Sequence, residues 1–181
     1  MELIRILASK NEGSLDGLYS IQFKGESQCE YDKLLEKWRN RLELFSFFKE
    51  NISDLQNGFW GNITIEEAMS ITAVDVDTFE EILRIHSQGG RYELQYIFQP
   101  LYNHEYRLTS LQKSKGKIKR SWLRLYALRL DGNCFVITGG AIKLTNDMRA
   151  AHLQAELKKM DHIRAFLHAK DIYIPDDLNS L

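Results

Sequence analysis

The chain has 181 residues, of which 44% are hydrophobic and 27% are charged, and its formal net charge is −1. These values are typical of globular domains and exclude a disordered, collagen-like or low-complexity chain. The length predicts one domain, and no run approaches the ~20 apolar residues that a membrane-spanning helix needs. Two cysteines and a short apolar N-terminus without signal-peptide features lead us to expect a cytoplasmic protein without disulfides.

The N-terminal third is predicted to form a β-hairpin followed by a long helix. Short strands are expected at residues 3–7 and 18–23, with a polar, glycine-containing turn between them. Apolar side chains recur three and four positions apart from Tyr31 to Leu55. This spacing predicts one amphipathic helix.

The next segment is predicted to be an acidic helical insert. Thr64-Ile65-Glu66-Glu67 has the spacing of a capping box, so we expect a helix to begin there. Gly89-Gly90 can end a helix in the left-handed conformation. We therefore interpret residues 62–88 as an acidic helical insert in the domain.

The pattern changes to that of strands after the insert. Apolar and polar residues alternate from Tyr92 to Phe98, which predicts a strand, and residues 113–117 are expected to form a flexible basic tip. Two β-rich runs, 122–130 and 134–137, flank Asp131-Gly132-Asn133, a strong turn signal. These runs are predicted to form the central hairpin.

The C-terminal part is predicted to close the domain with a helix. Asn146 can cap it, and apolar residues from Leu153 to Leu167 trace one face. The order of elements predicts an α+β fold in which a small antiparallel sheet carries N-terminal helices and a C-terminal helix. We expect residues 1–174 to form one domain and residues 175–181 to be a flexible tail.

Charge is distributed unevenly along the chain. Residues 50–90 contain eight acidic residues and a single basic one, Arg84, whereas residues 106–130 contain eight basic residues and no acidic one. This split predicts one electropositive face that can meet phosphates and an acidic segment that can shield it. The alternative interpretation is a pair of solvated surfaces whose charges offset each other.

The motifs of several site classes are missing from the sequence. It contains no Gly-x-Gly-x-x-Gly, no phosphate-binding loop, no Cys-x-x-Cys, no His-Glu-x-x-His and no Gly-x-Ser-x-Gly. The three histidines of the C-terminal helix are not spaced to hold a metal together. We therefore expect neither a metal nor a cofactor.

The basic hairpin is the remaining candidate site. Arg124 and Tyr126 share one face of a strand, and together with Lys143 they can hold a phosphate and stabilise the charge that develops when a 2′-hydroxyl attacks it. His104 can supply acid or base catalysis. The other candidate RNA-binding residues are basic or aromatic side chains of the same region: Lys113, Lys115, Lys117, Lys119, Arg120, Trp122 and Arg129. In the alternative interpretation, the arginines form salt bridges and Tyr126 packs in the core.

One stretch resembles a known family. The run from Arg120 to Thr145 reads RSWLRLYALRLDGNCFVITGGAIKLT. An Arg, an aromatic residue, a turn at Asp-Gly and a closing Gly, apolar, Lys, Thr segment are similar to the C-terminal hairpin of RelE/ParE-superfamily toxins, closest to the phage-derived HigB-like branch. The early strand, the amphipathic helix and the glycine-rich start of the sheet at residues 89–94 look similar too.

This resemblance implies a RelE-like domain and the toxin of a type II toxin-antitoxin system. Such a protein is a ribosome-associated mRNA endoribonuclease that needs no metal, and its partners are mRNA, the ribosome and a cognate antitoxin. The resemblance places Arg124 and Lys143 on phosphate and Tyr126 on a base. Two alternatives stay open: a RelE-like binding module that has lost catalysis and holds a protein partner, and a gyrase-inhibiting toxin. The chain departs from the family in its near-neutral charge, its insert, its long loop at 99–121 and the Leu144 that replaces a second lysine.

Overall fold

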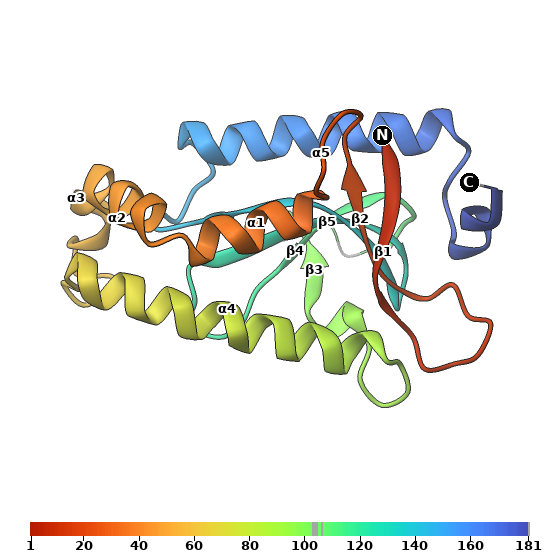
Figure 1. The fold of residues 1–181 in the computed structure, drawn as a ribbon, viewed down its shortest axis with the longest axis horizontal. Helices are drawn as coiled ribbons and strands as arrows, with labels where there is room; N and C mark the ends of the chain where they lie inside the picture. The colour runs from red at the N-terminus through yellow and green to blue at the C-terminus, as the bar shows by residue number, and fades with distance from the viewer. Residues whose placement is uncertain (103–104, 106, 181) are drawn as a thin grey trace.

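The computed structural model describes residues 1–102, 105 and 107–180. Figure 1 shows the path of the chain. The strands are β1 (Glu2–Ala8), β2 (Gly17–Gln22), β3 (Phe98–Pro100), β4 (Gln112–Gly116), β5 (Leu123–Asp131) and β6 (Cys134–Ile142). The helices are α1 (Glu30–Arg39), α2 (Arg41–Glu50), α3 (Ile52–Leu55), α4 (Ile65–Ser87) and α5 (Ala151–Ala169), with 3-10 helices η1 (Leu94–Tyr96) and η2 (Pro175–Ser180).

The six strands form one mixed sheet in the order β1-β2-β6-β5-β4-β3. All neighbours are antiparallel except β2 and β6, which run parallel from the pair Gly17 and Cys134 to the pair Ser20 and Ile137. The α+β class is therefore confirmed, and the sheet that was expected to be antiparallel contains one parallel pair. A tight turn forces two strands to be antiparallel, whereas β2 and β6 are separated by most of the chain and are free to pair in parallel.

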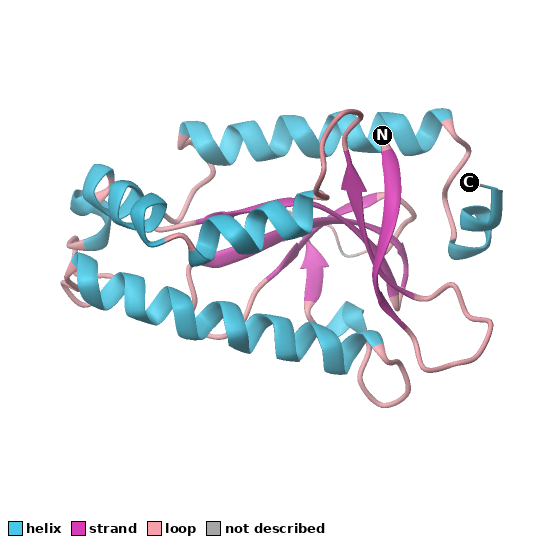
Figure 2. Cartoon of the chain, in the orientation of Figure 1, coloured by secondary structure: helices cyan, strands magenta, loops and turns pink. Residues whose placement is uncertain are grey.

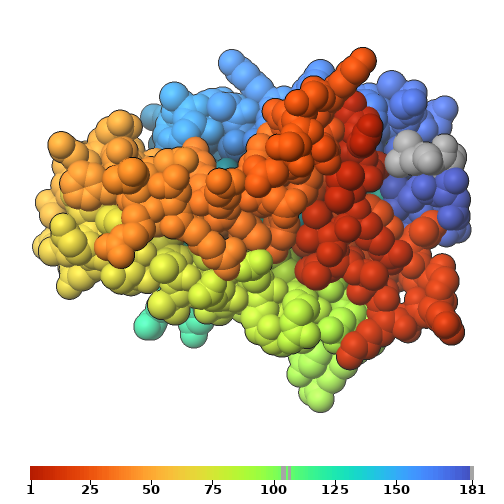
Figure 3. All heavy atoms as spheres, in the orientation of Figure 1, coloured from red at the N-terminus to blue at the C-terminus, as the bar shows by residue number. Residues whose placement is uncertain are grey.

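Helices cover both faces of the sheet, as Figures 1 and 2 show. On one face, α1, α2 and α4 pack against alternate residues of β5 and β6, including Leu125 and Phe135. On the other face, Ile163 of α5 packs against Leu128 and Val136. Figure 3 shows that α1, α4 and the N-terminal hairpin form a continuous surface on the face nearest the viewer. None of the helices that the structure describes is both long and apolar enough to cross a bilayer.

The predicted helix from Tyr31 to Leu55 is three helices. Asn40 ends α1 with an extended backbone and caps α2, because its side-chain oxygen accepts hydrogen bonds from two backbone amides of the next turn. Asn51 separates α2 from the short α3. Asparagine competes with the helix in this way because its short side chain satisfies the free amides of a new helix start. The apolar period continues through both breaks and therefore did not reveal them.

The predicted insert is one helix of 23 residues, α4, and it belongs to the core. The capping box is present as expected, with Thr64 and Glu67 bonding each other's backbone amides. Its acidic outer face is held by α1, because Arg39 donates hydrogen bonds to Asp77 and Glu80. Asp77 and Glu80 of the acidic helix are therefore engaged with α1 and not with the basic hairpin.

The segment from Tyr92 to Phe98 that was predicted to be a strand contains the 3-10 helix η1, and β3 begins only at Phe98. The reason is a long-range contact with the turn between β5 and β6. The Leu94 amide donates to Asn133 Oδ1 at 3.0 Å, and the Gln95 amide donates to the Gly132 carbonyl at 3.0 Å. These two amides are therefore not free to join a strand ladder.

The segment expected to be a flexible basic tip is strand β4, which pairs with both β3 and β5. Its burial alternates, with Ser114 buried between the half-buried Lys113 and Lys115. The central hairpin is confirmed as β5 and β6. The closing helix α5 begins at Ala151 with Ala150 in the N-cap position, not at Asn146.

The C-terminal residues expected to be a flexible tail form η2. Asp177 in this 3-10 helix accepts hydrogen bonds from the amides of Tyr173 and Ile174, at 2.8 and 3.0 Å. Leu178 is partly buried against the α5 side of the sheet. The polar and apolar contacts together explain why the segment follows the domain surface.

Candidate functional site

The pairing of three strands gathers basic residues at one end of the sheet. Lys115 on β4 pairs with Tyr126 on β5. Arg124 lies two residues before Tyr126 and so points to the same face of β5. The amide of Lys143 donates to the Trp122 carbonyl at 2.8 Å and extends the pairing of β5 and β6 beyond the end of β6. Three neighbouring strands thus each bring at least one basic residue to this end.

These residues line a cavity of about 380 Å³. Its basic side chains are Lys115, Lys117, Arg124 and Lys143, and Tyr126 forms part of the wall. Among the described residues that line it, none is Asp or Glu. The structure therefore brings Arg124, Tyr126 and Lys143 together. The same cavity is also lined by Lys115 of β4 and by Lys117, which follows β4 directly.

Backbone carbonyls hold the cations of this cavity in place. Arg124 Nη1 donates to the carbonyls of Ser121 and Leu123, both at 2.6 Å. Lys143 Nζ donates to the Thr145 carbonyl at 2.6 Å, and Lys115 Nζ donates to the Leu101 carbonyl at 2.9 Å. A carbonyl satisfies a donor without cancelling its charge, so the side chains are positioned while the cavity stays electropositive.

The electrostatics of the cavity follow from burial and crowding. Burial lowers the pKa of Lys115, and the nearby charges of Lys117 and Arg124 lower it further. Burial and the charges of Arg124 and Lys115 likewise lower the pKa of Lys143, with Asp147 opposing them. Burial also lowers the pKa of Arg124. Like charges held this close favour the entry of an anion, which relieves their mutual repulsion.

Tyr126, which was expected to stack on a base, and Trp122, the aromatic member of the other candidate RNA-binding residues, are core residues. Tyr126 is 1% exposed, burial raises its pKa, and its hydroxyl approaches Met148 Sδ at 3.7 Å. Trp122 is also 1% exposed, and its Nε1 donates to Thr72 Oγ1 at 3.0 Å. Neither ring has a free face, because the packing of the sheet end covers both. The role in base stacking therefore does not fit these two residues.

The other predicted RNA-binding residues divide into two groups. Lys113 is paired with Asp161 at 2.7 Å, and Arg129 lies 3.6 Å from Asp131. The salt-bridge interpretation expected a pair for Arg129 and for Arg124, but Arg124 donates to backbone carbonyls instead. Lys119 and Arg120 are exposed and line a second hollow next to the cavity. His104 lies outside the described residues.

Several residues that line the cavity could not be predicted as site residues from the sequence. Leu101 and Tyr102 come from the segment after β3, and Asn146 and Met148 come from the segment before α5. These segments are far apart in the chain and meet only because β3 and β6 lie in the same sheet. Hydrophobic periodicity and turn residues predict local structure, and they do not predict which distant segments come into contact.

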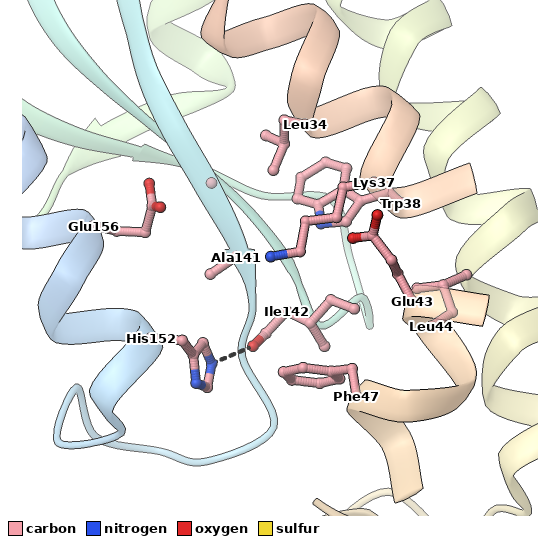
Figure 4. A pocket seen from close by; sticks show the side chains of 11 residues that line it. Leu34, Lys37, Trp38, Glu43, Leu44, Phe47, Ala141, Ile142, His152 and Glu156 are labelled. Carbon is pink, nitrogen blue, oxygen red and sulfur yellow. Dashed lines mark hydrogen bonds between the residues drawn. The ribbon is translucent and has the colours of Figure 1, made fainter. Parts of the chain in front are cut away.

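A second, smaller cavity of about 80 Å³ lies between α1, α2 and α5 (Figure 4). Figure 4 shows His152 and Glu156 of α5 on one side of β6, and Leu34 and Trp38 of α1 on the other. His152 Nε2 lies 3.0 Å from the Ile142 carbonyl. This cavity is mostly apolar and too small for a nucleotide, so we do not regard it as the functional site.

Comparisons of the chain with protein-family models, curated proteins and solved structures found no match. Within the described residues, no three His, Cys, Asp or Glu side chains lie close enough to hold a metal ion. The interpretation of the site therefore depends on its own geometry and charge. A semi-enclosed space with several fixed cations, and with no Asp or Glu among the described residues that line it, is suited to a phosphate or another multivalent anion.

Proposed function

We propose that the protein is a RelE-like toxin that binds the phosphate backbone of mRNA in the basic cavity and cleaves it. The observation that carries the proposal is the convergence of Lys115, Arg124 and Lys143 on one cavity whose described lining contains no acidic residue. The resemblance of the run from Arg120 to Thr145 to toxins of this superfamily supports the choice of RNA.

The proposed reaction is attack of a ribose 2′-hydroxyl on the adjacent phosphorus. The new bond gives a 2′,3′-cyclic phosphate, and the bond to the 5′-oxygen of the next nucleotide breaks. The 2′-hydroxyl gives its proton to water, and the leaving 5′-oxygen takes a proton from water. Negative charge builds up on the phosphoryl oxygens as the new bond forms. In this proposal Arg124 and Lys143 bind these oxygens, because pre-positioned cations in a partly dry site stabilise such charge better than water does. Tyr126 serves as a wall of the site.

The partners that this proposal includes are mRNA on the ribosome and a cognate antitoxin, in the cytoplasm. Both partners follow from the resemblance to toxins of this superfamily. A protein that binds a ribosome-bound strand also needs an exposed basic surface, and Lys117 is both exposed and part of the cavity lining.

Salt dependence of RNA binding tests the backbone contacts. For a single strand, log K falls with log salt with a slope of about −0.7 for each phosphate neutralised. We expect Lys117→Ala and Lys143→Ala each to make this slope less steep by about 0.7, the contribution of one phosphate. Fluorescence anisotropy with a labelled oligoribonucleotide measures the affinity at each salt concentration. Lys24→Ala is the matched control, because Lys24 is exposed and lies outside the cavity lining. Equal slopes for all variants would contradict the proposed site.

Controlled expression in a bacterium tests the toxin activity. We expect growth arrest with the wild type and normal growth with the Arg124→Ala, Lys143→Ala double variant at equal soluble level. Mapping of RNA ends then distinguishes mRNA cleavage from gyrase inhibition. Normal growth with both proteins would contradict the toxin and favour the binding module without catalysis.

The lowered pKa of Lys115 and Lys143 adds a pH test. A lysine whose pKa is lowered loses its charge at a lower pH than free lysine, which titrates near about 10.4. We therefore expect RNA affinity to fall as the pH rises, beginning below that range. In Lys143→Met the fall should be smaller, because one of the two titrating cations is gone.

A further inference from the structure

A second hollow adjoins the basic cavity. It has a volume of about 740 Å³, and Lys117 and Arg124 line both spaces. Its further basic residues are Lys119 and Arg120, and its described lining contains no Asp or Glu. The two spaces are therefore adjacent, and Lys117 and Arg124 are the basic residues that they share.

The far wall of this hollow is aromatic, and Phe59 is its exposed member. Phe59 is 64% exposed, although it is one of the largest apolar side chains. It lies in a tight loop in which Asn57 Oδ1 accepts a hydrogen bond from the Phe59 amide at 2.9 Å. Gly58 and Gly61 on either side have φ values of 86° and 91°, which residues with a Cβ rarely adopt. The loop conformation thus presents the ring outward.

The ring has a fixed support. Phe59 meets Trp60 edge to face, with ring centroids 4.9 Å apart and an interplanar angle of 89°. Trp60 is anchored in turn, because its Nε1 donates to the Leu144 carbonyl at 2.9 Å and its ring packs against Trp122 at 5.2 Å. A supported ring loses little freedom when a flat partner stacks on it, which favours binding.

We infer that Phe59 is a stacking platform for a base of single-stranded RNA whose backbone runs along Lys117 and Arg124 from the basic cavity. This inference rests on the proposed RNA binding and adds a subsite to it. Grooves for single-stranded nucleic acid combine a basic track with aromatic rings, because every base has a flat face that stacks. Phe59 would thus take the role that the buried Trp122 and Tyr126 do not fill.

An acidic peptide is the competing occupant, since it would also be attracted to the cations. The observations favour RNA because the hollow pairs an exposed ring with four basic residues, and a peptide carboxylate gains nothing from a ring face. Paired bases are stacked inside their duplex and hide their faces, so the platform also predicts a preference for single strands.

The test compares three probes of equal length and charge by fluorescence anisotropy: a labelled oligouridylate, its abasic analogue and a polyglutamate peptide. The variants are Phe59→Ala, Phe59→Leu and Phe59→Tyr. Phe45→Ala is the matched control, because Phe45 is an exposed phenylalanine on α2 that lines neither basic space. Thermal unfolding of each variant verifies that the fold is retained.

We expect Phe59→Ala and Phe59→Leu to bind oligouridylate about tenfold more weakly, equivalent to ~1.4 kcal/mol, with an unchanged salt slope. Phe59→Tyr and Phe45→Ala should bind as the wild type does. The abasic probe should not distinguish any of these variants. Leu is informative because it keeps the apolar bulk and removes the flat ring.

Each other result overturns the inference in a recognisable way. If Phe59→Ala binds oligouridylate as the wild type does while Lys143→Ala lowers the salt slope, the platform is wrong and the proposed function stands. If the abasic probe loses affinity equally, Phe59 acts through the fold and not through a base. If the wild type binds polyglutamate strongly and Phe59→Ala loses that affinity, the surface binds an acidic peptide and not RNA. Absence of RNA binding by the wild type would overturn both proposals.

Discussion

Two groups of charged side chains lie beside β6 and differ in how their charges are compensated. In the first group, Lys159 of α5 pairs with Glu30 at 2.6 Å and with Glu156 at 3.0 Å, and both carboxylates are largely buried. Lys33 adds a second pair to Glu30. In the second group, the basic cavity, carbonyl oxygens hold Arg124 and Lys143.

The difference separates a structural role from a binding role. In the first group, opposite charges lie in contact and link α1 to α5, so each cation already has a carboxylate partner. Like charges gathered in a cavity whose described lining holds no carboxylate cost stability and favour the binding of an anion. If this comparison is right, substitutions in the first group change mainly the free energy of unfolding, and substitutions in the second change mainly RNA affinity.

The largest effect on stability is expected for Lys159→Met. This change leaves the largely buried Glu156 without its cation and Glu30 with Lys33 as its remaining partner, so we expect the free energy of unfolding to fall by about 3 kcal/mol. Urea unfolding followed by circular dichroism measures it. Lys158→Met is the control, because Lys158 is exposed on the same helix. A loss as small as that of the control would show that the pairs contribute little.

The next largest effect is expected for Gly139→Ala. A Cβ at this position would lie 2.1 Å from Glu156 Oε2 and 2.6 Å from Lys159 Nζ, and the backbone φ of 151° disfavours a side chain. We expect a loss of about 1–3 kcal/mol in the same unfolding experiment. Gly25→Ala serves for comparison, since it has a positive φ and open space around it. If Gly25→Ala costs as much, crowding at the buried pairs is not the cause.

A smaller, pH-dependent effect is expected for Glu156→Gln. Burial raises the pKa of Glu156, with Lys159 opposing this. A carboxyl with a raised pKa binds its proton more tightly in the folded state, so folding is favoured as the pH falls toward that pKa and disfavoured as the pH rises through it. We expect Glu156→Gln to be the more stable protein near pH 8, by less than about 2 kcal/mol, and the gap to close toward pH 5. If the difference in the free energy of unfolding between the two proteins did not change with pH, the titration of Glu156 would not be its cause.

The smallest effect on stability is expected for Lys143→Met. Its removal relieves repulsion with Arg124 and Lys115, so the free energy of unfolding should stay within about 1 kcal/mol of wild type or rise. RNA affinity measured on the same sample should nevertheless fall. A large loss of stability with unchanged RNA affinity would place Lys143 in the structural group and remove the contrast between the two.

Part of the site could be read from the sequence. Arg124 and Tyr126 are two residues apart in a predicted strand, and that spacing alone places them on one face. Lys143 follows the turn in the same hairpin, so its approach to Arg124 depends on local pairing. The exposure of the aromatic residues could not be predicted from the sequence. A hydrophobicity pattern does not distinguish the exposed Phe59 from the buried Tyr126 and Trp122.

The sequence by itself determined the elements that depend on neighbours in the chain. The β5–β6 hairpin follows from Asp131-Gly132-Asn133, and the start of α4 follows from its capping box, because turns and caps are formed by residues a few positions apart. The parallel pairing of β2 with β6, the loss of a strand at Leu94 and the closing of the basic cavity were decided by tertiary structure. Each depends on groups distant in sequence, whose meeting is fixed by burial of the shared core and not by any local preference of the chain.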